Sequence, residues 1–102
     1  MGKPEAKIED YLVERVKALG GECRKVEWVG RRGAPDRLVM VPPGIVAYPG
    51  PEYGHTIWVE LKAPGEKPKP HQVREHQRMR ALGQRVEVID SFEGVDALLG
   101  GA

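Results

Sequence analysis

Apolar residues near the start of the chain recur with the period of an α-helix. They share one face of a helix of about 3.6 residues per turn, at positions Ile8, Leu12, Val16 and Leu19. Pro4 suits a first helical turn, and the glycine pair at 20–21 suits a stop. The pattern predicts an amphipathic helix over residues 4–19.

Further along, short apolar runs alternate with loops that are rich in glycine and proline. The run that follows Arg37 is almost continuously apolar, which is typical of a strand buried on both faces. β-branched and aromatic residues favour another strand before Lys62. The predicted strands are 22–28, 36–41, 56–62 and 85–90. Residues 42–54 form a longer connection than a tight hairpin needs, with a short extra strand at 45–48, a substrate-facing loop and a simple insertion as the alternatives.

Two more helices complete the pattern. One runs over residues 70–82 and stops at Gly83, and its positions Gln72, His76 and Met79 share a face. The other covers 92–99, with Ser91 as its N-cap. The order α-β-β-β-α-β-α predicts an α/β fold in which helices flank a small mixed sheet. At 102 residues, the chain is expected to form a single domain over 1–102.

Composition excludes several classes of protein. Hydrophobic residues make up 40% and charged residues 30%, as in a globular protein rather than a disordered one. No apolar run is long enough to span a membrane or to form a secretory signal. The single cysteine, Cys23, can form neither an intrachain disulfide nor a cysteine-based zinc site. These features predict a protein of the reducing cytoplasm that does not bind membranes.

Charge is distributed unevenly along the chain. Residues 62–85 hold seven basic side chains and two acidic ones, a local balance of +5, whereas the whole chain carries only +1. One face that meets a polyanion would explain this distribution, and so would a solvated helix face. His71 and His76 flank the same basic helix and could contact phosphate.

Three charged residues lie where apolar strands begin or end. Asp36 opens one strand, and Glu60 and Lys62 share a face at the end of another because they are two residues apart. If the two strand ends are adjacent, the carboxylates converge beside a lysine. Hard divalent ions take such oxygen ligands together with substrate phosphate. The alternative is a surface ion pair, with Asp36 capping a turn.

The ordered set of motifs resembles a known superfamily. Gly33-x-Pro35-Asp36, then Glu60-x-Lys62, then Gln72 in the following helix are similar to the PD-(D/E)xK nucleases, and within them to the VRR-NUC (virus-type replication-repair nuclease) family. The resemblance covers roughly residues 5–90. It implies a restriction-endonuclease-like core that binds Mg²⁺ or Mn²⁺.

The resemblance also implies roles for individual residues. Asp36 and Glu60 match the metal ligands, together with the backbone carbonyl of Leu61. Glu5 matches a helical acid that contacts the metal through water, with Glu9 as the alternative if the helix phase differs.

Two further positions match the chemistry-bearing residues of the family. Lys62 corresponds to the catalytic lysine. Gln72 corresponds to a glutamine near the scissile phosphate, although a polar residue that merely opens a helix would look the same.

The expected activity is metal-dependent hydrolysis of DNA by a structure-selective endonuclease. Stand-alone members of the family resemble Holliday junction resolvases that act as homodimers, often phage-encoded, so branched DNA is the expected substrate. Action on flaps, nicks or ends, and an inactive nucleic-acid-binding module, are the alternatives. The expected DNA contacts are basic residues near the site, namely Arg31, Arg32, Lys69, Arg74 and Arg78.

Overall fold

The computed structural model describes residues 4–46 and 54–100. Helices and strands follow one another in the predicted order. Their bounds are α1 (Pro4–Ala18), β1 (Glu22–Lys25), β2 (Arg37–Val41), β3 (His55–Leu61), α2 (Pro70–Ala81), β4 (Val86–Ile89) and α3 (Phe92–Leu98). The prediction of a small mixed α/β fold is confirmed.

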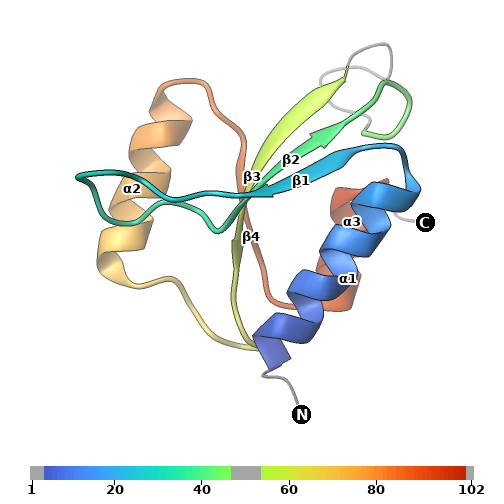
Figure 1. Cartoon of the computed structure of the whole chain (residues 1–102). Helices are drawn as coiled ribbons and strands as arrows, with labels where there is room; N and C mark the ends of the chain where they lie inside the picture. The colour runs from blue at the N-terminus through green and yellow to red at the C-terminus, as the bar shows by residue number, and fades with distance from the viewer. Residues whose placement is uncertain (1–3, 47–53, 101–102) are drawn as a thin grey trace.

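The four strands form one mixed sheet in the order β1-β2-β3-β4. β2 pairs antiparallel with both β1 and β3, whereas β3 and β4 are parallel. Parallel neighbours need a crossover connection, and α2 supplies it. Figure 1 shows α1 and α3 together on one side of the sheet and α2 on the other.

The two faces of β3 differ in chemistry. Ile57, Val59 and Leu61 belong to the hydrophobic core, which they share with the buried stripe of α1 and with α3. Because side chains alternate along a strand, Trp58 and Glu60 lie on the opposite face, where Glu60 contacts Gln72 and His76 of α2. The apolar core therefore lies on one side of the sheet, and the ionisable end of β3 lies on the other.

One strand prediction differs from the structure, and another falls partly outside the described residues. The strand expected over 22–28 ends at Lys25, although the N–H of Val26 still donates to the carbonyl of Asp36 at 3.0 Å. Beyond this bond the chain leaves the ladder, and the ring of Trp28 packs against that of Trp58 with centroids 5.5 Å apart. Residues 45–46 form no strand, and positions 47–48 lie outside the described residues.

None of the helices within residues 4–46 and 54–100 combines the length and apolar character needed to cross a lipid bilayer.

Candidate active site

The register of the sheet brings the two strand-end carboxylates together. Arg37 of β2 lies opposite Val59 of β3, so one further step along this antiparallel pair places Asp36 opposite Glu60. Directly opposed side chains in such a pair have Cβ atoms about 5 Å apart. The carboxylate of Asp36 also accepts a hydrogen bond from the backbone N–H of Leu61, at 2.7 Å. Asp36 is thus fixed against the end of β3.

The carboxylate of Glu60 lies at the centre of the site and is only 3% exposed. Its Oε2 accepts a hydrogen bond from Nε2 of Gln72 at 3.3 Å and lies 3.9 Å from Nζ of Lys62. Its Oε1 lies 3.5 Å from Nε2 of His76 and has no hydrogen-bond partner. Side chains from β3 and α2 therefore surround both oxygens.

The pKa of Glu60 is raised to about 8. Burial is the largest cause, the charge and hydrogen bond of Asp36 and the charge of Glu5 act in the same direction, and the charge of Lys62 opposes them. Carboxylates that share a site disfavour one another's ionisation. A buried, acid-rich pocket of this kind favours either a proton or a bound cation.

The two candidate acids of α1 have different surroundings. Glu9 forms an ion pair with Arg37, in which Oε2 of Glu9 and Nε of Arg37 are 2.8 Å apart. Glu5, one turn earlier, is the acid of α1 whose charge raises the pKa of Glu60. Glu5 therefore influences the charge of Glu60, whereas Glu9 is paired with Arg37.

Gln72 contacts both the start of α2 and the candidate site. Its Oε1 accepts a hydrogen bond from the backbone N–H of Lys69, the residue before α2, at 2.8 Å, and so caps the helix. Its Nε2 donates to Glu60. One amide joins the start of α2 to the carboxylate at the end of β3.

A second buried carboxylate organises the basic residues. Glu75 is 3% exposed and accepts hydrogen bonds from Trp28, Arg31 and Arg78 at 2.8–3.1 Å. The bond from Arg78, followed by that from Arg31, lowers the pKa of Glu75. Sequence reasoning missed this role, and the only signal was the three-residue spacing between Glu75 and Arg78.

These residues line a hollow of about 550 Å³ between the 30–35 loop and α2. Four of the five predicted DNA contacts line it, whereas Lys69 does not. The full lining is Arg31, Arg32, His71, Arg74, Glu75 and Arg78.

Close contact between loop and helix explains a glycine of the motif. Gly33 has φ +89°, which side chains rarely adopt. A Cβ at this position would lie 2.9 Å from Cβ of Glu75 and from the carbonyl oxygen of His71. The loop that carries Asp36 therefore rests directly on α2.

His76 differs from its prediction. The sequence suggested a phosphate contact on an exposed basic helix, but the side chain is buried beneath α2 against Glu60. The prediction is wrong because this face of α2 packs on the polar face of the sheet. A buried residue at this position can therefore be polar, and its burial leaves no apolar signal in the sequence.

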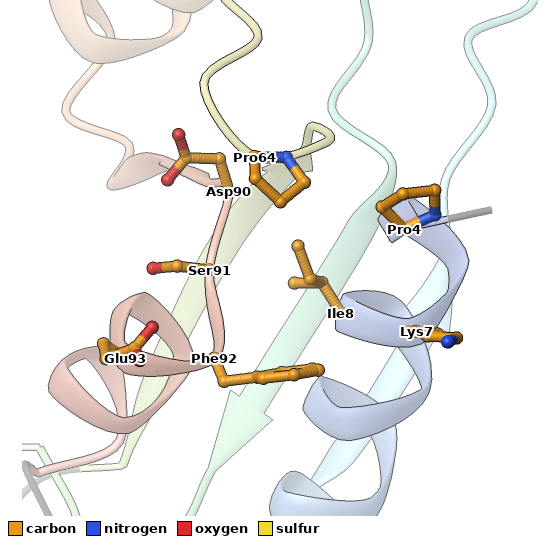
Figure 2. A pocket seen from close by; sticks show the side chains of 8 residues that line it. All are labelled: Pro4, Lys7, Ile8, Pro64, Asp90, Ser91, Phe92 and Glu93. Carbon is orange, nitrogen blue, oxygen red and sulfur yellow. The ribbon is translucent and has the colours of Figure 1, made fainter.

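A mainly apolar pocket of about 300 Å³ lies between the first turns of α1 and the segment that leads into α3. Figure 2 shows the side chains of Ile8 and Phe92 extending into the space between these two segments, while the carboxylate of Asp90 points away from it. None of the candidate site residues lines this pocket, so we keep it separate from the candidate active site.

Metal-binding capacity rests on a small donor set. Among the residues that the structure describes, no three His, Cys, Asp or Glu side chains gather as a metal cluster. The candidate metal ligands are therefore the two opposed carboxylates, Asp36 and Glu60. One buried oxygen of Glu60 lacks a hydrogen-bond partner. Hard ions such as Mg²⁺ are commonly held by one or two carboxylates. The donors present fit such an ion.

A mixed sheet between helices, with opposed carboxylates and a lysine at the strand ends, is the arrangement of a PD-(D/E)xK nuclease core. Comparisons with known proteins agree. No protein-family model matches the chain. A protein named "Putative nuclease p44", from Acyrthosiphon pisum secondary endosymbiont phage 1, is 49% identical over 87 residues, covering 85% of this chain and 83% of the relative.

A solved structure described as "VRR_NUC domain" superposes with a TM-score of 0.78 at 42% identity, covering 95% of each chain. The chain belongs to the VRR_NUC family of nucleases.

Proposed function

We propose that this nuclease is a metal-dependent DNA endonuclease. The observation that carries the proposal is the pairing of two carboxylates, Asp36 and Glu60, beside the buried amine of Lys62. In this proposal, Asp36, Glu60 and the carbonyl of Leu61 hold Mg²⁺ or Mn²⁺, and Glu5 contacts the ion through water. The raised pKa of Glu60 supports a cation here, since a positive charge would offset the repulsion between the acids.

When bound, the ion polarises the scissile phosphate and makes water a stronger nucleophile. Side chains of the protein stabilise charge and position the metal ligand. Nζ of Lys62, 3.9 Å from the Glu60 carboxylate, brings a positive charge to the place where negative charge develops on phosphate. Gln72 holds the Glu60 carboxylate, and in this proposal its place at the start of α2 faces the DNA backbone.

The basic hollow supports DNA as the substrate. Arg31 and Arg78 keep 52% and 44% of their side chains exposed while Glu75 fixes their guanidinium groups. Such preorganised arginines lose little side-chain entropy on binding phosphate. Arg32 and Arg74 extend the surface, and Lys69 lies at the N-cap of α2. In our proposal these five residues hold the phosphates that flank the cut.

We also propose branched DNA as the preferred substrate and a homodimer as the active form. A 102-residue chain carries one such site, and two sites related by a two-fold axis would give paired cuts across a junction. The cytoplasm of a bacterial or phage-infected host is where we place this activity.

A cleavage assay tests the proposal. Synthetic four-way junctions, flaps and linear duplexes are incubated with Mg²⁺, Mn²⁺ or EDTA, using the wild type and Glu60→Ala. We expect metal-dependent cleavage that the variant loses and that is fastest on the junction. Equal cleavage by the variant, or cleavage in EDTA, would refute the assignment of the site. Preference for linear ends would refute the branched substrate alone, and sedimentation of the active protein as a monomer would refute the dimer.

A further inference from the structure

Two polar atoms that lack hydrogen-bond partners face one another inside the protein. Among the described residues, three buried side-chain atoms have no partner, and two of them are Oε1 of Glu60 and Nε2 of His76. These two atoms are 3.5 Å apart. Both side chains are at most 3% exposed, so bulk water does not satisfy either atom.

α2 presents a pair of side chains to this carboxylate. Gln72 and His76 are four residues apart and so lie on the same face of the helix. Gln72 donates to Oε2 of Glu60, and His76 faces Oε1. Met79 is buried on the next turn of the same face and packs the helix against the sheet. Two different residues of α2 therefore face the two oxygens of one carboxylate.

Packing alone does not explain an imidazole at position 76. A buried polar group without a partner costs about 1–3 kcal/mol, whereas leucine would fill a similar volume without that penalty. A protonated imidazole nitrogen can donate a hydrogen bond, and Nε2 of His76 faces an oxygen of Glu60 that has no other partner.

We propose that His76 is a positioning residue for Glu60: its Nε2–H group donates to Oε1 and, with Gln72 on Oε2, fixes the rotation of the carboxylate that faces Asp36. This inference deepens the proposed function and rests on it, since a fixed carboxylate matters most to a site that binds a divalent ion. Groups that orient metal ligands in this way typically change metal affinity by about 10- to 100-fold when removed.

The test uses two substitutions at position 76 and a matched control. His76→Leu keeps the volume and removes the donor, and His76→Gln returns an N–H group near the place of Nε2. Met79→Leu, on the same buried face, controls for repacking. We measure Mn²⁺ affinity by calorimetry, and kcat and KM for DNA cleavage.

We expect His76→Leu to weaken Mn²⁺ binding and to lower kcat, each at least about tenfold, with KM for DNA within about twofold. His76→Gln should recover most of both losses, and Met79→Leu should change neither. Wild-type Mn²⁺ affinity in His76→Leu would overturn the inference. Equal losses in His76→Leu and His76→Gln would overturn it as well, because the shape of the ring would then matter rather than its donor.

One spectroscopic readout separates this inference from the proposed function. In the ¹⁵N spectrum of the metal-free wild type, His76 should carry its proton on Nε2, and its signals should shift in Glu60→Gln. A proton on Nδ1 alone would overturn the positioning role, even if His76→Leu fails to fold. A wild type that neither binds Mn²⁺ nor cuts DNA, yet shows the Nε2 proton and the shift, would refute the nuclease site and leave the hydrogen bond standing.

Discussion

Replacing Glu60 by glutamine should make the metal-free protein more stable while it abolishes cleavage. The pKa of Glu60 is raised from 4.5 to about 8, because the carboxylate is buried beside Asp36. A pKa raised by folding gives stability that is complete below the unfolded value and is lost as the pH rises through the folded value. Glutamine is neutral at every pH, so the variant escapes this loss.

The size of the gain follows from the shift. Each unit of difference between the folded and unfolded pKa corresponds to about 1.4 kcal/mol. At pH 9, the free energy of unfolding of the wild type should therefore be lower than that of Glu60→Gln by roughly 3–5 kcal/mol. At pH 6 the difference should be about 2 kcal/mol. A domain is typically stable by only about 5–15 kcal/mol, so this difference is large.

Urea unfolding in EDTA, at pH values from 5 to 9, measures the difference. The free energy of unfolding of Glu60→Gln should exceed that of the wild type by an amount that grows with pH and levels off above pH 8. Glu66→Gln, in the exposed loop before α2, is the control and should show no such trend. Saturating Mn²⁺ should close the gap at pH 8 by stabilising the wild type alone. A difference that does not depend on pH, or a variant less stable than the wild type at pH 8, would refute the reasoning.

Three other substitutions test separate parts of the structure. Lys62→Ala should reduce cleavage at least about 100-fold, because Lys62 lies beside Glu60. DNA affinity measured by fluorescence anisotropy should fall less than about threefold, because Lys62 is one of many cations. A parallel fall in cleavage and affinity would make Lys62 a phosphate contact. Arg74→Ala should lower affinity for all DNA sequences and reduce the log–log salt slope by about one, and an unchanged slope would remove it from the interface. Gly33→Ala should lower Tm, because its Cβ would meet the backbone of α2 at 2.9 Å; an unchanged Tm would mean that the loop moves freely.

Much of the fold could be predicted because its signals are local. The apolar stripe of α1 and the strand composition of β3 each determine an element by themselves. The opposition of Asp36 and Glu60 also followed from alternation along two strands, once their ends were taken as adjacent. The end of β1 at Lys25 could not be predicted, because it depends on where Trp28 finds a ring to pack against.

The polar interior could not be predicted for a different reason. Glu75 and His76 are buried against Trp28 and Glu60, which come from distant segments, and a helix face made of such residues looks in sequence like a face exposed to solvent. Residues 86–99 carry only acidic charges, and their partners could not be predicted either. Asp96 pairs with Arg15 and Glu87 with Arg85, so two of these charges are balanced within the chain.

The double role of Gln72 has a consequence for how such a sequence can evolve. Its amide caps α2 and holds Glu60 at once, so drift at this position would erode folding together with activity. Loss of the carboxylate at position 60 would instead raise the free energy of unfolding. A lineage released from selection for cleavage should therefore lose Glu60 first and keep Gln72, and descendants of that kind would persist as folded DNA-binding remnants.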